Sequence, residues 1–240
     1  MEVLVREFNT RPCVVHGHGK HDYQYWWEPI KSAFFSTPPR IPTIPPGLTI
    51  ITCNNGHPAM GMFESSLEYL GVPYRVFGQD INPWLNSRDK PTVLASALAL
   101  VDTPYVLYAD SRDAILIGDP AKALDRYEHQ FSCDILFGAD RINWPPEREF
   151  ARFEEPLARQ AHSEFRYLNG GLWIGRTAYC AEFFSRAATV APVESAVESE
   201  QGILKKLFPE CYPHVQLDYH CEIFLNTGFL LSHDALEILP

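Results

Sequence analysis

The residues best suited to chemistry in this sequence are two aspartates, Asp110 and Asp113, which follow directly on the apolar run Tyr105–Ala109. Two carboxylates that flank one turn can bind Mg²⁺ or Mn²⁺ and leave coordination positions open for diphosphate oxygens. The metal then stabilises the negative charge that develops on a departing diphosphate. A solvated acidic turn has the same spacing, so the aspartates alone leave both interpretations open.

The aspartates are expected at the end of a strand, because the run before them is short and apolar. Leu48–Cys53 has the fully apolar, β-branched character of a strand buried on both faces of a parallel sheet. We expect strands at residues 48–53, 74–77, 105–109, 134–139 and 167–174 and near Val215 and Ile223, and helices at residues 59–70, 92–101, 121–130, 178–188 and 200–208. This alternation predicts an α/β domain with a mostly parallel central sheet flanked by helices, whose ligand binds at the carboxyl ends of the strands.

Two segments lack a clear periodicity. Residues 140–163 are charged and contain prolines, and we expect them to form a long loop of the kind that is often functional. Residues 38–46 contain five prolines and predict a stiff connection between residues 1–37 and an α/β body at residues 47–240. We interpret residues 1–240 as a single domain.

Composition excludes several classes of partner. The formal net charge is −10 and the basic residues are scattered, so nucleic acid is not expected to bind. No apolar run approaches the roughly 20 residues of a membrane span, and no leader segment is visible. These features predict a soluble chain and favour the cytoplasm without settling the compartment. The six cysteines form no Cys-x-x-Cys motif and are interpreted as buried free thiols.

Family landmarks surround the two aspartates. Residues 105–113, Tyr-Val-Leu-Tyr-Ala-Asp-Ser-Arg-Asp, resemble the strand and metal motif of the glycosyltransferase domain of procollagen lysyl hydroxylases (PLOD) and their relatives. Similar segments follow that family's order at residues 48–52, 78–90, 137–140, 144–145, 167–171, 200–201 and 217–218. The resemblance implies a GT-A, Rossmann-like nucleotide-diphospho-sugar transferase fold. It also implies metal-dependent transfer of a hexose from UDP-glucose or UDP-galactose, with Mn²⁺ or Mg²⁺ as the cofactor.

The N-terminal segment Arg11–Lys20 resembles the motif that closes this family's domain, and the resemblance makes His16 the third metal ligand beside Asp110 and Asp113. Here the motif comes first in the chain. We therefore interpret the sequence as a circular permutation in which residues 38–46 form the new connection, which close termini make tolerable. The alternative is that residues 1–20 are the tail of a preceding domain.

The resemblance also assigns the donor site. It implies that Ile51, Thr52, Trp84 and Lys90 contact the donor together with Asp110, Arg112, Gly170 and Gly171. Arg112 replaces the aromatic residue that stacks on the base in the collagen-modifying members, and an arginine can stack on a base or contact phosphate. A preference for uridine is therefore less secure here than nucleotide binding as such.

Glycosyl transfer needs a base for the acceptor, or a group that steadies an oxocarbenium-like centre. Our catalytic candidates are Glu200, Asp140 and Asn169, with Asp218 as a further acid. Ser199 stands where the family has the first acid of a pair, so Glu200 is equally explained as a glutamate at a helix N-terminus. Asn143 and Trp144, in the long loop, are the candidates for acceptor binding.

Two other functions remain open. Ser199 and Arg112 make a nucleotide-sugar-binding domain without transfer activity conceivable. A metal-dependent nucleotidyltransferase or phosphotransferase uses similar carboxylates, but the sequence contains no Gly-x-x-x-x-Gly-Lys loop.

Overall fold

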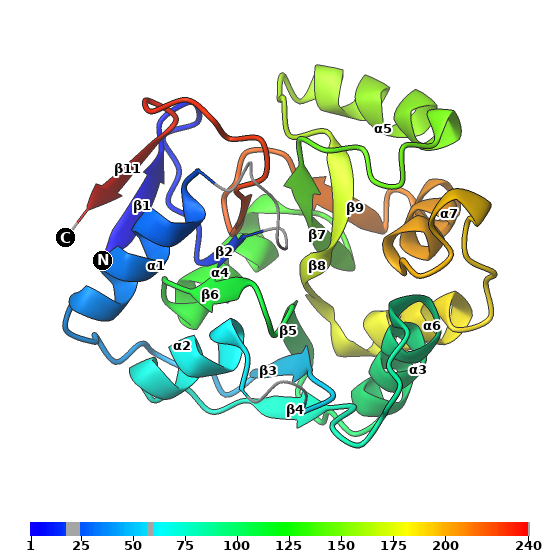
Figure 1. Ribbon diagram of the computed structural model, residues 1–240, viewed down its shortest axis with the longest axis horizontal. Helices are drawn as coiled ribbons and strands as arrows, with labels where there is room; N and C mark the ends of the chain where they lie inside the picture. The colour runs from blue at the N-terminus through cyan, green and yellow to red at the C-terminus, as the bar shows by residue number, and fades with distance from the viewer. Residues whose placement is uncertain (18–24, 57–59, 240) are drawn as a thin grey trace.

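A twisted sheet with five of its six strands parallel forms the centre of the fold (Figure 1). The computed structural model describes residues 1–17, 25–56 and 60–239. The order across the sheet is β4 (Arg75–Phe77), β3 (Leu48–Cys53), β5 (Tyr105–Ala109), β8 (Tyr167–Arg176), β7 (Ile135–Asp140) and β9 (Val215–Asp218). β8 runs antiparallel to β5 and β7, whereas the other neighbours are parallel. The predicted α/β fold with a mostly parallel sheet is confirmed.

Helices connect these strands and cover the sheet. They are α2 (Met62–Leu70), α3 (Asn86–Leu98), α4 (Pro120–Gln130), α6 (Thr177–Ala187) and α7 (Gln201–Cys211). α3 packs against α6 at the lower right of Figure 1, and α6 and α7 both contact β8. α2 ends at Leu70, as predicted, and its C-cap is Gly71, whose φ of +67° is the left-handed conformation that glycine adopts without a steric penalty.

A three-stranded sheet brings the N-terminal segment next to the body. Its central strand is β2 (Val14–His16), which pairs in parallel with β10 (Phe224–Asn226) and antiparallel with β6 (Ala114–Leu116). Nearby, β1 (Glu2–Val5) pairs with β11 (Leu236–Leu239), so that Glu2 lies opposite Leu239 and the two ends of the chain are side by side (Figure 1). The sequence patterns predicted neither β1, β2, β6 and β11 nor helix α1 (Trp27–Ser36).

The prediction of a long loop at residues 140–163 is wrong, because α5 (Arg148–Gln160) occupies half of it. Phe150, Glu154 and Ala158 recur every four residues and are buried, which is a helical stripe. The central residue of this stripe, Glu154, is an acid, so the sequence does not show a continuous apolar pattern here. The predicted start of the helix at residue 92 is also too late, since α3 begins at Asn86 and contains Pro91.

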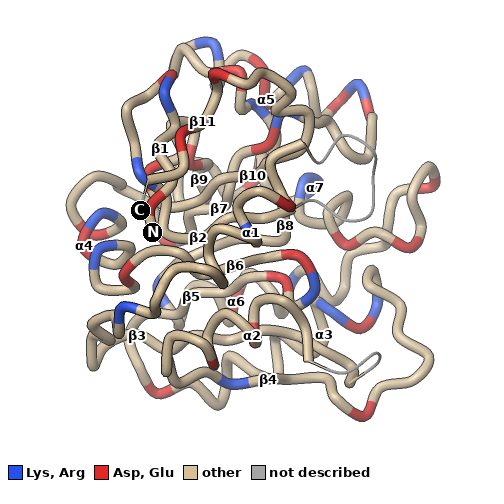
Figure 2. Tube along the Cα trace, turned by 60° about the vertical axis from the view of Figure 1, so that its left-hand side comes forward, with Lys and Arg blue, Asp and Glu red and all other residues tan. Residues whose placement is uncertain are grey.

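Further features concern the connection before β3, the cysteines, the helices and the surface charge. Residues 38–45 adopt no helix or strand. The cysteines are all free thiols, and five of the six are buried. Among the described residues, none of the helices has the length and apolar character needed to cross a membrane. Figure 2 shows lysines and arginines dispersed among acidic residues along the trace.

Candidate active site

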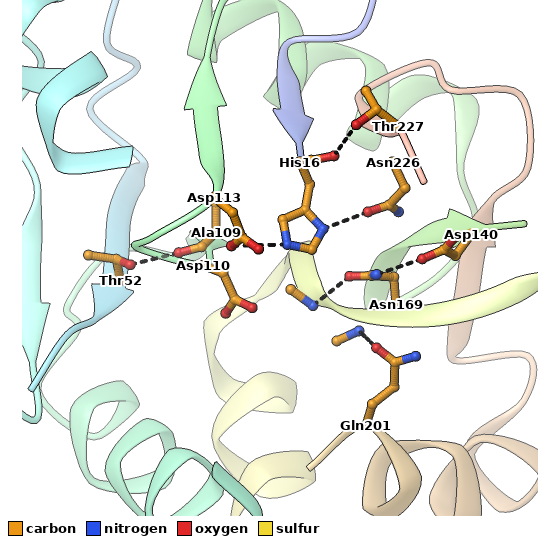
Figure 3. Close-up of polar contacts among 12 residues, drawn as sticks. His16, Thr52, Ala109, Asp110, Asp113, Asp140, Asn169, Gln201, Asn226 and Thr227 are labelled. Atoms are coloured by element: carbon orange, nitrogen blue, oxygen red, sulfur yellow. Dashed lines mark hydrogen bonds and ion pairs between the residues drawn. The ribbon is translucent and has the colours of Figure 1, made fainter. Parts of the chain in front are cut away.

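Three residues of metal-binding type converge at the end of β5. Asp110 follows the strand, Asp113 closes the turn that leads into β6, and His16 is the last residue of β2. One ligand atom from each lies within 4.8 Å of the others. The His16 Nε2 atom is 3.2 Å from Asp113 Oδ1 (Figure 3). Two carboxylate oxygens and one imidazole nitrogen form a donor set that suits Mn²⁺ and related divalent ions.

Backbone pairing fixes this convergence. The register of β2 and β6 places His16 opposite Ala114, next to Asp113. The backbone N–H of Gly17 donates to the Asp113 carbonyl at 2.6 Å, and that of Asp110 donates to the Gly171 carbonyl at 2.8 Å. The side chains therefore meet because three separate strands hold their backbones.

Gly171 leaves the space that the cluster needs. A Cβ atom at this position would lie 2.9 Å from Asp110 Oδ2, 2.9 Å from His16 Cε1 and 3.0 Å from Asn169 Oδ1. Such distances are too short for any side chain without displacement of its neighbours. The backbone of β8 is thus the floor of a cradle whose walls are the candidate metal ligands, and this cradle fits a divalent ion.

The imidazole of His16 is buried between acids and an amide. Burial lowers its pKa, but the nearby charges of Asp113 and Asp110 outweigh burial and raise the pKa to about 9. His16 Nδ1 lies 2.8 Å from Oδ1 of Asn226 on β10. Protonation of the ring is thus favoured by the negative charge of the two carboxylates.

A buried lysine connects the cluster to Glu200. Lys90, on α3, is 4% exposed and donates to Asp110 Oδ1 and to Glu200 Oε1, both at 2.6 Å. Although burial alone would lower the pKa of Lys90, the carboxylates of Asp110 and Glu200 raise it above its usual range. The Tyr108 hydroxyl also donates to Asp110 Oδ1 at 2.6 Å. The sequence pointed to Lys90 and Glu200 separately, and the structure places them in direct contact.

A cleft of about 700 Å³ opens beside the cluster. Trp84 and Arg112 line it with Lys90 and the two aspartates. Gly78 makes room for the indole, because its φ is +84° and a Cβ there would lie 2.7 Å from the Trp84 ring. The Arg112 guanidinium donates to Asn55 Oδ1 at 3.2 Å. The cleft is large enough for a nucleotide.

Ile51 and Thr52 lie next to this cleft, but their side chains do not line it. Both are fully buried, and the Thr52 hydroxyl donates to the Ala109 carbonyl at 2.7 Å (Figure 3). Cys53 and Asn54, which follow them, do line the cleft. Thr52 therefore holds β3 against the end of β5, where Asp110 begins.

Two of the other catalytic candidates, Asp140 and Asn169, form a hydrogen-bonded chain. Asp140, at the end of β7, is fully buried and accepts from Ile142 N at 3.0 Å and from Asn169 Nδ2 at 2.9 Å. Asn169 Oδ1 in turn accepts from Gly171 N at 2.8 Å. Figure 3 shows this chain running from β7 to the cradle. The geometry suits positioning of β8 better than proton transfer by Asp140.

The acceptor candidates lie further out. The Asn143 amide oxygen accepts from Lys205 Nζ at 2.6 Å, whereas Trp144 is 43% exposed. Gln201 donates to the Trp144 carbonyl at 2.7 Å and accepts from Gly170 N at 3.2 Å. Gln201 thus links the Trp144 segment to Gly170 of β8, the strand that also carries Gly171. A Cβ at Gly170 would lie 2.8 Å from Leu204, which explains the glycine by packing.

Two polar residues of the site were not predicted. Glu64, on the buried face of α2, accepts from Asn54 Nδ2 and from Ser111 Oγ, both at 2.7 Å, and so holds the turn between the aspartates. The sequence signal that could have identified Glu64 is its position, as an acid, inside the apolar stripe of α2. Asn226 follows the apolar run before it without any local signal of its role. The remainder of the N-terminal motif, residues 18–20, lies outside the described residues.

A family model described as the PLOD GT domain matches residues 48–236. No curated protein matches the chain. The matched residues include β3, the turn with both aspartates, β8 and β10, whereas His16 lies before them.

Proposed function

The chain belongs to the family of PLOD glycosyltransferase domains, and on this premise we propose that it transfers a hexose from UDP-glucose or UDP-galactose to an acceptor with the help of Mn²⁺ or Mg²⁺. The observation that carries the proposal is the convergence of His16, Asp110 and Asp113 beside the cleft. In such a site the metal neutralises the diphosphate that departs from the sugar.

Charge supports binding of a nucleoside diphosphate in an otherwise acidic chain. Lys90 and Arg112 line the cleft on the side of the two aspartates. With a divalent ion bound, these groups offset the charge of the diphosphate, and Trp84 offers an aromatic face for the base. The side chains of Cys53 and Asn54 take the place in the cleft that the sequence had suggested for Ile51 and Thr52.

For the transfer step we propose Glu200 as the principal acid near the donor sugar, because it is joined to Asp110 through Lys90. Asp140 and Asn169 are proposed to act by holding Gly171 and thereby the shape of the cradle. We place the acceptor near Trp144, the exposed aromatic residue beside this region.

We further propose that residues 1–37 supply the closing segment of a circularly permuted domain. Three observations support this proposal: β2 lies between β10 and β6, the two ends of the chain pair through β1 and β11, and the family match begins only at residue 48. Under the alternative, in which residues 1–20 are the tail of a preceding domain, contact between His16 and Asp113 would not be expected.

Calorimetric titration with UDP tests the proposal. We expect UDP to bind in the presence of Mn²⁺ and much more weakly without it, and we expect UDP release from UDP-glucose or UDP-galactose. The variant Asp113→Asn is expected to lose Mn²⁺-dependent binding, whereas Asp125→Asn, at an exposed position on α4, should not. Absence of metal-dependent UDP binding by the wild-type chain would overturn the proposal.

A second function is favoured by the hydrogen bond that Lys90 donates to the Glu200 carboxylate. Ser199 precedes Glu200 where the family has an acid. A nucleotide-sugar-binding domain without transfer activity has these properties. Binding of UDP-sugar with Mn²⁺ but without UDP release, over a range of sugar acceptors, would assign the chain to this function.

A further inference from the structure

We propose that Asn226 is a positioning residue that fixes the ring of His16 so that its Nε2 atom faces the metal position. The inference rests on the metal-dependent function proposed above. It concerns a side chain that belongs to β10, near the other end of the chain, and that is not itself part of the candidate ligand set.

The amide orientation of Asn226 follows from its surroundings. The side chain is fully buried, and its Nδ2 atom donates to the carbonyl of Ala139 at 2.8 Å. A carbonyl only accepts hydrogen bonds, so the atom facing it must be the nitrogen. Gly138 allows this close fit, because a Cβ at that position would lie 3.1 Å from Asn226 Nδ2. The amide therefore has one orientation.

The orientation of the amide determines which nitrogen of His16 carries a proton. Asn226 Oδ1 lies 2.8 Å from His16 Nδ1, and an amide oxygen can only accept. Nδ1 must therefore be the donor. The opposite nitrogen, Nε2, points to Asp113 at 3.2 Å, and it is the nitrogen whose lone pair a metal would use (Figure 3). An imidazole oriented by a partner on its other nitrogen is the usual arrangement at protein metal sites.

The same segment also holds the backbone of His16. Thr227 N–H and Thr227 Oγ1 donate to the His16 carbonyl at 3.0 and 3.1 Å. In the β2–β10 register, Asn226 lies opposite His16. One pair of consecutive residues thus fixes both the backbone and the ring of a ligand that is carried by a strand of three residues.

The test compares three variants by titration with Mn²⁺ in a fixed excess of UDP, with bound metal read by electron paramagnetic resonance. Asn226→Leu removes the acceptor for Nδ1–H and is expected to weaken Mn²⁺ binding about 10- to 100-fold. Asn226→Asp keeps an acceptor oxygen for Nδ1–H but loses the Nδ2 donor to the Ala139 carbonyl, so it is expected to bind Mn²⁺ more weakly than the wild type and more tightly than Asn226→Leu. Thr10→Val, the control, removes a buried hydroxyl that bonds the carbonyl of His220 and not His16, and it is expected to change affinity little.

Wild-type binding of Mn²⁺ tests the proposed function, and the order of the variants tests the inference separately. Equal Mn²⁺ affinity in the wild type and a folded Asn226→Leu variant overturns the inference. If that variant does not fold, the wild-type protein decides the question through ¹H–¹⁵N spectra of the His16 ring with Mg²⁺ and UDP bound. A proton on Nδ1 supports the inference, and a proton on Nε2 overturns it.

Discussion

Lys90 donates a 2.6 Å hydrogen bond to Glu200, a residue 110 positions later in the chain. The same ammonium group bonds Asp110 at 2.6 Å, so one buried cation separates the candidate metal ligand from the candidate catalytic acid. Lys90 thereby bridges the carboxylates of Asp110 and Glu200. Any positive charge that arrives at Asp110 competes with the ammonium group for the same carboxylate.

Removal of Lys90 is expected to destabilise the protein strongly. Lys90→Met leaves Asp110 and Glu200 without their shared buried cation, and we expect a loss of about 3–5 kcal/mol in the free energy of unfolding. Urea denaturation measures this loss. Mn²⁺ is expected to restore part of it. Lys122→Met, at an exposed position on α4, serves as the control, and equal stabilities of the two variants would contradict the prediction.

Metal binding is expected to strengthen as the pH rises. His16, whose pKa is about 9 in the metal-free protein, must lose a proton to become a ligand. Below about pH 9 the apparent Mn²⁺ affinity should therefore increase by up to about tenfold per pH unit and should level off above it. Anaerobic titrations at several pH values measure the slope. His16→Gln should bind weakly, and its affinity should lack this dependence on proton release from His16.

Gly171→Ala is expected to damage the metal site more than the fold. The added methyl group would lie 2.9 Å from Asp110 Oδ2 and from His16 Cε1, so these ligands must move apart. We expect at least a tenfold loss of Mn²⁺ affinity and a destabilisation of about 1–3 kcal/mol. Gly47→Ala is the matched control, because a Cβ there meets its nearest neighbour at an ordinary 3.5 Å. Unchanged Mn²⁺ affinity in Gly171→Ala would contradict the conclusion that Gly171 leaves the space that the metal ligands need.

The buried pair of Glu154 and Lys205 is expected to be replaceable only as a pair. Their charged atoms are 2.9 Å apart, the side chains are 1% and 0% exposed, and burial raises the pKa of Glu154 to about 7 and lowers that of Lys205. Lys205→Met alone should cost about 3–5 kcal/mol, whereas Glu154→Leu with Lys205→Met should be neutral or stabilising. A urea-denaturation double-mutant cycle checks this, and additive costs would contradict it.

Reversal of the proposed permutation is expected to preserve the fold. A short linker from residue 240 to Met1, with new ends opened within residues 38–46, would leave β1 paired with β11 and β2 between its neighbours. We expect a cooperative thermal transition and Mn²⁺-dependent UDP affinity within about threefold of the parent. An unfolded product, with the linker length varied, would count against the permutation. New ends placed inside β8 provide the control that should not fold.

Sequence patterns predicted the sheet well because its strands are apolar runs buried on both faces. Tyr105–Ala109 coincides with β5, and the aspartates that follow it lie where a parallel sheet presents its ligands. Local patterns failed where partners are distant. β2 has three residues and owes its existence to β6 and β10, and Asn226 gains its role from a histidine 210 positions away.

Sequence patterns also did not predict the direction in which each side chain points. Thr52 and Cys53 are neighbours on one strand, yet the first bonds to β5 and the second faces the cleft. A resemblance at the level of segments does not distinguish these directions. In α5 the obstacle was charge, since Glu154 takes a core position that only its pairing with Lys205 makes tolerable.

The position of β2 between β6 and β10 has a consequence for biosynthesis. On the ribosome, His16 emerges long before Asp113, and Asn226 emerges later still. The strand that carries His16 therefore cannot complete its pairing with β6 and β10 until most of the domain has been synthesised. Nascent chains arrested before β10 have emerged are accordingly expected to fold parts of the sheet while their imidazole and carboxylates stay apart, so that metal capture marks the completion of the fold.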